Sequence, residues 1–277
     1  MQYNVFLSGG GMKGAYQYGF FKELYVRWPD FPIKKVYAVS VGAMNSVPIV
    51  TRRMDALDKY WCNQDTLHPF DTIADDWEDF NGFTPAIKVE IDGFIKWSKP
   101  AKRFGALFKY GSMFKRVKRE PYETFLKDID AEGWHSLKTK LVIISYDKVA
   151  RKSIYTQSST IEEIVDSIQA STRFPGLFDV SDEINVDGTF ANISHMLTHE
   201  HNEKWLCLYL QNTLHSKFKK CASIYYPKIA NVPILNEAAC LLSNRHMLDS
   251  FIINGKQDAK AFVSVAMNCH LKHEYLQ

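Results

Sequence analysis

The chain lacks the features of a membrane-spanning or secreted protein. No apolar run approaches the ~18 residues that a spanning helix needs. The first residues do not contain a basic stretch, a long apolar stretch and a small-residue cleavage site in succession, so no secretory signal is predicted. The five cysteines are scattered, odd in number and without a Cys-x-x-Cys pair, which favours reduced thiols. We therefore expect a cytoplasmic protein.

Acidic residues are missing from residues 94–119. Nine basic residues lie there, and removing them from the total of 34 leaves 25 basic against 31 acidic residues, so the net charge of +3 comes from this segment. Aromatic side chains alternate with the basic ones, a mixture that favours peripheral docking on an anionic membrane. A solvated basic face, or a site for nucleic acid or an acidic partner, are the alternatives. The candidates to face a membrane are Lys96, Trp97, Lys102, Arg103, Phe104, Phe108, Lys115 and Arg116.

Predicted strands and helices alternate along most of the chain. The pattern predicts strands over 3–7, 36–39, 140–146, 153–155, 184–186 and 205–210. It predicts helices over 15–28, 42–51, 54–64 and 160–171, and a mostly helical region over 236–266 with a break near Asn254-Gly255. The pattern weakens from about 65 to 133, which suggests a cap or insertion within a single domain over 1–277. This alternation predicts an α/β fold with a mainly parallel sheet covered on both faces.

A serine at the end of a predicted strand is the most informative feature of the chain. Ser40 closes the apolar run 36–39, and a small residue stands two positions away on each side, Ala38 and Gly42. This arrangement is typical of a sharp strand-to-helix turn that presents a serine hydroxyl as a nucleophile. The pattern therefore predicts that Ser40 is catalytic and that Ala38 and Gly42 shape its turn.

A glycine cluster upstream of Ser40 has more than one interpretation. Gly9, Gly11 and Gly14 satisfy the dinucleotide pattern G-x-G-x-x-G, but the acidic residue required after the next strand is missing. A phosphate-binding P-loop fails because a glycine follows Lys13 where serine or threonine is needed. Two interpretations remain, glycines that only permit a tight turn and a loop whose N–H groups stabilise an oxyanion. The nearby Ser40 favours the second.

The base that would activate Ser40 is less apparent. None of the nine histidines ends a predicted strand. Three of them form a His-x-x-x-His-x-His pattern that a metal could use, but without a convincing acidic ligand: His195, His199 and His201. Asp187 follows the predicted strand 184–186 and precedes a glycine, so its carboxylate would meet Ser40 at the carboxyl edge of the sheet. An ordinary Asp-Gly turn would explain the same residues.

Together these motifs resemble the patatin-like phospholipases. That family combines a Gly-Gly-Gly-x-Arg/Lys-Gly oxyanion loop, a Gly-x-Ser-x-Gly elbow, an Ala-Ser-x-x-x-Pro segment and an Asp-Gly dyad partner. The loop corresponds to Gly9-Gly10-Gly11-Met12-Lys13-Gly14 and the elbow to Ala38-Val39-Ser40-Val41-Gly42. The segment beginning at Ala170-Ser171 matches the third motif, and Asp187-Gly188 with Asn192 matches the fourth. The motifs follow the family's order over residues 4–194.

The resemblance implies a three-layer α/β/α fold related to the α/β hydrolases, and a phospholipase A type of activity on phospholipid or other fatty-acyl esters. It implies Ser40 as nucleophile and Asp187 as base, with no metal, cofactor or nucleic-acid partner. Ala38 in place of glycine, Lys13 in place of arginine and Thr189 in place of a small residue depart from the family pattern. These departures concern catalytic efficiency, and the alternative is a non-catalytic lipid-binding or regulatory module of the same fold.

Overall fold

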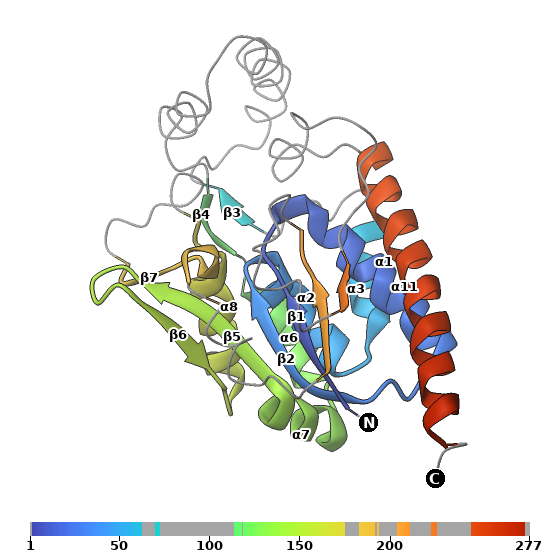
Figure 1. Ribbon diagram of the computed structural model, residues 1–277. Coiled ribbons are helices and arrows are strands. Elements are labelled where there is room, and N and C mark those ends of the chain that lie inside the picture. Colours follow the sequence, from blue (N-terminus) through green and yellow to red (C-terminus); the bar gives the residue numbers. More distant parts are fainter. Residues whose placement is uncertain are drawn as a thin grey trace.

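The chain forms a mixed α/β structure with a mainly parallel central sheet flanked by helices, as predicted (Figure 1). The computed structural model describes residues 2–62, 70–72, 114–117, 119–174, 183–191, 193, 204–210, 223–225 and 245–274. The strands are β1 (Tyr3–Leu7), β2 (Ile33–Val39), β3 (Phe70–Thr72), β4 (Phe114–Val117), β5 (Leu141–Asp147), β6 (Lys152–Thr156), β7 (Asn185–Val186), β8 (Lys204–Leu208) and β9 (Ser223–Tyr225). The α-helices are α1 (Gly14–Arg27), α2 (Val41–Val50), α3 (Met54–Cys62), α6 (Glu120–Lys127), α7 (Ala131–Lys140), α8 (Ile161–Thr172) and α11 (Arg245–Glu274).

The main sheet has the strand order β6-β5-β2-β1-β8-β9. The strands from β5 to β9 in this order are parallel to their neighbours, whereas β6 and the short β7 both run antiparallel to β5. Strand β6 pairs with β5 from Ile143 to Asp147, and β7 pairs with Tyr146 and Asp147 of the same strand. A strand has only two edges, and β6 occupies one edge of β5. Strand β7 therefore lies on the other edge, where β2 pairs with the earlier residues of β5, Leu141 to Ile144.

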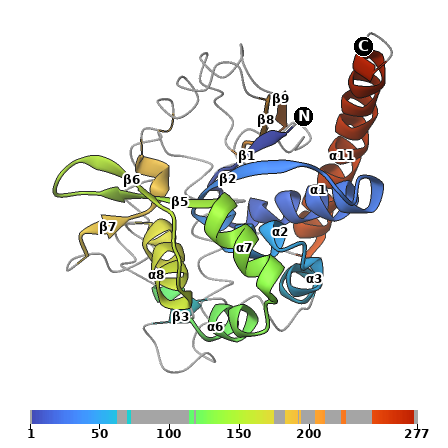
Figure 2. The ribbon, with the colours of Figure 1, turned by 90° about the horizontal axis from the view of Figure 1, so that it is seen from below.

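The two faces of the sheet bury separate sets of apolar side chains. Alternate residues of a strand point to opposite faces, so Val5 and Leu7 belong to one cluster and Phe6 to the other. All the apolar side chains that the described α-helices bury belong to the first cluster, and Figure 2 shows α1, α2 and α7 on one side of β1 and β2. Among the described residues, no α-helix buries apolar side chains in the second cluster.

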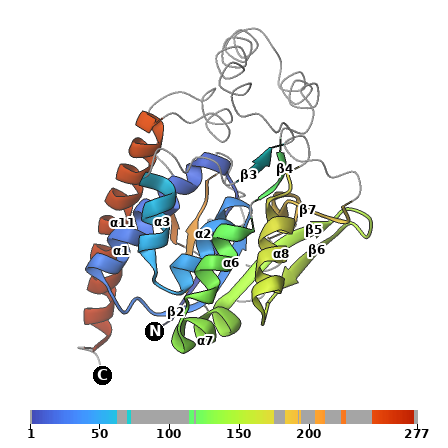
Figure 3. The same cartoon turned by 180° about the vertical axis from the view of Figure 1, so that it is seen from behind.

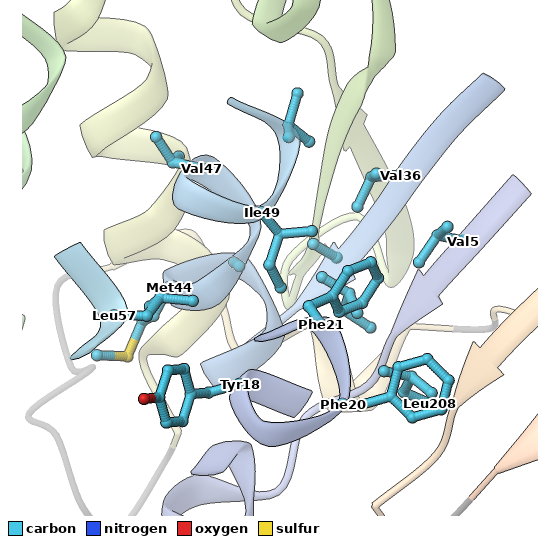
Figure 4. Close-up of a cluster of buried hydrophobic side chains, with 14 of the residues drawn as sticks. Val5, Tyr18, Phe20, Phe21, Val36, Met44, Val47, Ile49, Leu57 and Leu208 are labelled. Atoms are coloured by element: carbon cyan, nitrogen blue, oxygen red, sulfur yellow. The ribbon is translucent and has the colours of Figure 1, made fainter. Parts of the chain in front are cut away.

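The first cluster holds the large aromatic side chains of the N-terminal half. Phe20 and Phe21 of α1 are fully buried and pack near Val5, Val36 and Leu208 of the sheet (Figure 4). Burying one such side chain contributes about 1.5–3 kcal/mol to stability. This packing fixes α1 against the strands and thereby fixes the glycine cluster that lies between β1 and α1.

The predicted break at Asn254-Gly255 is wrong, because α11 continues through both residues. A side-chain Cβ at Gly255 would collide with the carbonyl oxygen of Tyr16 in α1, and one at Gly19 would collide with the carbonyl oxygen of Ile252. The two glycines therefore allow α1 and α11 to approach backbone to backbone, and the helices lie side by side in Figures 1 and 3. In this helix glycine serves close packing and does not interrupt it.

The predicted cap or insertion, residues 65–133, lies mostly outside the described residues. Within it, β3 and β4 form a separate antiparallel pair, and α6 follows β4. Leu126 of α6 is fully buried in the first cluster, so α6 packs on the main domain. Among the residues that the structure describes, no helix is long and apolar enough to cross a membrane.

Candidate active site

Ser40 occupies a strained turn between β2 and α2. Its backbone has φ 55° and ψ −124°, a conformation that non-glycine residues rarely adopt and that costs about 1–3 kcal/mol. The Ser40 carbonyl accepts hydrogen bonds from the N–H groups of Ala43 (2.8 Å) and Met44 (3.2 Å) and so begins α2. The residue is partly exposed. The structure thus contains the strand-to-helix turn that the sequence pattern predicts at this position.

The two small residues of the turn have different environments. A Cβ at Gly42 would collide with the carbonyl oxygen of Leu7, so α2 can begin against the end of β1 only with glycine there. Ala38 lies within β2, opposite Leu7 and Ile143, and its methyl group is buried in the first core cluster. The close approach that requires glycine is therefore at Gly42, and the core accommodates the methyl group of Ala38.

Asp187 follows a strand that runs toward Ser40 from the opposite direction. It follows β7, which lies on the edge of β5 that pairs with β2, and the last residues of β2 and β7 stand opposite Ile144 and Tyr146 respectively. The Asp187 side chain is fully buried, and its Oδ1 accepts a hydrogen bond of 2.7 Å from the N–H of Thr189. Ser40 and Asp187 therefore leave two strands that point toward each other, and both lie beside β5.

The electrostatic environment of Asp187 favours proton uptake. Burial raises the pKa of this carboxyl from 3.8 to about 6, although hydrogen bonds from Thr189 and from the Ser40 hydroxyl lower it in part. The Ser40 contribution is weak, since Oδ2 of Asp187 makes no hydrogen bond of good geometry within the described part of the chain. Catalytic hydrogen bonds are often long in the absence of substrate and tighten when it binds. The Ser40 hydroxyl and the Asp187 carboxyl are therefore neighbours without a close hydrogen bond.

The glycine loop lies against Ser40 and Thr189. A Cβ at Gly9 would stand 2.9 Å from Cβ of Ser40 and 2.8 Å from Oγ1 of Thr189, so any side chain there would displace the site. Gly11 has φ 54°, a left-handed conformation that glycine adopts without strain. The loop leads through a short 3₁₀ turn into α1, whose N-terminus carries a partial positive charge.

The orientation of two peptide groups in the loop follows from their carbonyl partners. The Gly9 carbonyl accepts a hydrogen bond from the buried Ser8 hydroxyl (3.2 Å), and the Gly10 carbonyl accepts one from the N–H of Lys13 (3.2 Å). In a trans peptide the carbonyl and the following N–H point in opposite directions. The N–H groups of Gly10 and Gly11 are therefore directed away from these partners.

A buried network of polar side chains holds both ends of the glycine loop. The Trp61 indole N–H donates to Asn45 (3.1 Å), and the Asn45 amide donates to Gln17 (3.1 Å) and to the Gly14 carbonyl (3.0 Å). The Gln17 amide in turn donates to the Ser8 carbonyl (2.9 Å). The sequence interpretation missed these residues. The sequence feature that could have identified them is a polar residue within an apolar stretch of a helix. Gln17 is such a residue in α1, about one turn after the glycine loop, and Asn45 is one in α2, about one turn after Ser40.

Lys13 ties the loop to the end of β8. Its side chain is only 3% exposed, and Nζ donates a hydrogen bond of 3.1 Å to the Leu210 carbonyl. The Leu210 N–H donates to the Ser8 hydroxyl (2.8 Å), and Gly10 packs closely on the Leu210 side chain. A single ammonium group therefore suffices at this position, since the partner is one carbonyl and not a carboxylate that would favour the arginine fork.

Several predicted residues remain unassigned. Lys115 and Arg116 lie in β4, while the other candidates for membrane contact fall outside the described residues: Lys96, Trp97, Lys102, Arg103, Phe104 and Phe108. Asn192 and the three patterned histidines, His195, His199 and His201, also fall outside them. Within the described part of the chain, no group of three or more histidine, cysteine, aspartate or glutamate side chains is placed to hold a metal ion.

The fold and the site together define an α/β protein with a strained serine, a buried carboxylate and a glycine loop at the ends of its central strands. Residues 5–195 match the family model of the patatin-like phospholipases, so the chain belongs to that family and is placed among lipid-ester hydrolases. No curated protein matches the chain in sequence.

Two solved structures are similar to this chain at low sequence identity. The first is VipD from Legionella pneumophila, with 12% identity and a TM-score of 0.40 over 92% of this chain and 67% of VipD. The second belongs to the heterodimeric ExoU–SpcU complex of the type III secretion system of Pseudomonas aeruginosa, with 13% identity and a TM-score of 0.35. That match covers 93% of this chain, which spans about half (52%) of the matched one.

Proposed function

We propose that the protein is a lipid acyl hydrolase of the phospholipase A type, with Ser40 and Asp187 as its catalytic dyad. The observation that carries the proposal is the position of a partly exposed serine in a strained turn beside a fully buried carboxylate with a pKa of about 6. Ordinary surface turns need neither the strain nor the buried acid. Such features concentrate at functional sites.

In the proposed reaction, Oγ of Ser40 attacks the carbonyl carbon of a fatty-acyl ester while Asp187 accepts the hydroxyl proton. The electron pair of the carbonyl moves to its oxygen, and the N–H groups of Gly10 and Gly11, with that of Met12, stabilise the resulting charge. Removing one such donor typically lowers the rate by about 10²–10³-fold. Asp187 then gives its proton to the leaving alcohol as the ester bond breaks, and an acyl-enzyme remains.

Hydrolysis of the acyl-enzyme repeats these steps with water as the nucleophile. Asp187 takes a proton from the water molecule as its oxygen attacks the acyl carbon, and it returns the proton to Ser40 when the fatty acid leaves. A carboxylate is a weak base, so a pKa of about 6 brings it closer to the operating pH, where general-base catalysis is most effective. The burial of Asp187 thus supports its role as base without a histidine.

The activity is tested with the purified full chain and phospholipid vesicles, by measuring released fatty acid. We expect release of fatty acid together with covalent labelling of the protein by a fluorophosphonate, which reacts with activated serines. Mass spectrometry of the labelled peptide is expected to place the label on Ser40. Vesicle binding without release and without label would instead support the non-catalytic lipid-binding or regulatory module.

We further propose that the basic and aromatic segment 94–119 docks the enzyme on anionic membranes. Each Lys or Arg near such a surface contributes about 1 kcal/mol, and the acid-free composition of the segment supports this role. In a flotation assay we expect binding to anionic but not to neutral vesicles, and weaker binding after Lys102→Glu with Arg103→Glu. The exposed pair Lys127→Glu with Lys138→Glu changes the net charge equally and is the control. Equal loss in both variants would contradict local docking.

A further inference from the structure

The Ser171 side chain makes contacts that the proposed chemistry does not use. Ser171 lies in the last turn of α8 and is fully buried. Its Oγ accepts a hydrogen bond of 2.9 Å from the N–H of Ser40, and its hydroxyl donates one of 2.6 Å to the Ile144 carbonyl in β5. One hydroxyl group therefore joins the strained turn to β5. Its two partners are distant in sequence, since Ser40 lies 131 residues and Ile144 lies 27 residues before Ser171.

The Ser40 N–H needs such a partner because of its place in the fold. Ser40 precedes the first residue of α2, and the first N–H groups of a helix have no acceptor within the helix. The preceding ladder of β2 and β5 ends at Val39 and Ile144. The acceptor is the side chain of Ser171, at the point where the chain departs from ordinary backbone geometry.

The same end of α8 holds the other half of the dyad. The N–H of Asp187 donates a hydrogen bond of 3.0 Å to the Arg173 carbonyl, two residues beyond Ser171. Gly188 packs on the Ile144 carbonyl, the group that accepts the Ser171 hydroxyl, and a Cβ at Gly188 would collide with it. The position of Ser171 is thus linked through few bonds to the backbone of both Ser40 and Asp187.

We propose that Ser171 is a positioning residue of the dyad, which sets the orientation of Ser40 relative to Asp187 without touching the substrate. The expected effect on the reaction rate rests on the proposed function. The expected effect on the Ser40 turn rests only on the hydrogen bond between the Ser40 N–H and Ser171. Loss of the hydroxyl leaves the Ser40 N–H and the Ile144 carbonyl without their shared partner. The turn then relaxes, and a displacement of this kind can lower a rate by about 10²-fold.

The experiment compares Ser171→Ala and Ser171→Thr with Thr172→Val in the full chain, using a soluble short-chain ester. Thr172 is the buried neighbour on α8, and within the described part of the chain its hydroxyl donates to carbonyls of that helix alone, those of Ile168 and Gln169. We expect Ser171→Ala to lower kcat by about 10²-fold with little change in KM, and Ser171→Thr, which keeps the hydroxyl, to recover most of the rate. Thr172→Val is expected to keep the wild-type kcat.

A second measurement separates this inference from the proposed function. Hydrogen exchange of the Ser40 amide is expected to be at least about tenfold faster in Ser171→Ala than in wild type or Thr172→Val, since an unpaired N–H exchanges more readily. If wild type hydrolyses no ester but the exchange rates follow this order, the proposed function fails and the positioning role stands. Unchanged exchange at Ser40, or an equal loss of kcat in Thr172→Val, overturns the inference. If Ser171→Ala does not fold, Ser171→Cys replaces it. Because sulfur is a weaker acceptor, we expect a smaller decrease in kcat and a smaller increase in the exchange rate of the Ser40 amide.

Discussion

Replacing Ser40 by alanine is expected to lower the hydrolysis of phospholipid and short-chain esters by about 10⁴-fold or more. The substitution removes the nucleophile, so the loop and the carboxylate can bind an ester but cannot form an acyl-enzyme. The fold is expected to survive, because the turn is held through the N–H and carbonyl groups of residue 40, which alanine retains. Fatty-acid release, with circular dichroism and thermal unfolding on the same preparation, measures both effects.

Ser46→Ala is the matched control for this experiment. Ser46 lies on the same helix, α2, is fully buried and donates its hydroxyl hydrogen bond to the Ala43 carbonyl at 2.7 Å. We expect this variant to hydrolyse esters and to react with a fluorophosphonate as the wild type does, whereas Ser40→Ala does neither. Wild-type rates in Ser40→Ala would place the nucleophile elsewhere in the chain and contradict the dyad.

The central strands were predictable because their sequence signals are local. Strand β1 and residues 36–39 of β2 are buried on both faces, as parallel strands usually are, and they read as short apolar runs. The continuity of α11 was not predictable, since Gly255 is explained only by the carbonyl of Tyr16 on another helix. Helix α6 was also missed, because it begins at Glu120 within a segment whose apolar pattern is weak.

The site divides in the same way between local and distant signals. Ser40 and the glycine loop are contiguous motifs, and a motif of this kind predicts its own backbone turn. The placement of Asp187 depends on β7, a two-residue strand too short for any periodicity, which pairs antiparallel with β5. The supporting residues Gln17 and Ser171 act on partners in other elements, so only the folded chain shows what they contact.

Asp187→Asn is expected to lower ester hydrolysis by about 10²–10⁴-fold, the usual contribution of a general base, and at the same time to stabilise the fold. The amide oxygen can still accept the hydrogen bond from the Thr189 N–H. The amide cannot take the Ser40 proton, however, and it carries no charge into the buried site. Fatty-acid release measures the first effect, and urea denaturation at pH 4 and pH 8 measures the second.

The sign of the stability effect follows from the pKa of Asp187, which burial raises from 3.8 to about 6. Below the lower value the carboxyl is protonated in both the folded and the unfolded chain, so its ionisation does not affect stability. As the pH rises, the unfolded chain releases its proton first, and the folded state loses about 3 kcal/mol of relative stability by the time the pH exceeds 6. Asparagine never ionises, so the advantage of Asp187→Asn in free energy of unfolding is small at pH 4 and approaches this magnitude at pH 8.

Asp55→Asn provides a control of opposite sign. A hydrogen bond of 3.0 Å from Arg53 holds the pKa of Asp55 below its ordinary value, so this carboxylate stabilises the fold above that value and the contribution is lost as the pH falls. Asp55→Asn is therefore expected to be slightly less stable than wild type at pH 8 and fully active.

An active Asp187→Asn would contradict the dyad. An inactive Asp187→Asn with no gain in stability at pH 8 would mean that the Ser40 hydroxyl offsets the burial of the carboxylate, and the pKa of Asp187 would then have to lie near its ordinary value.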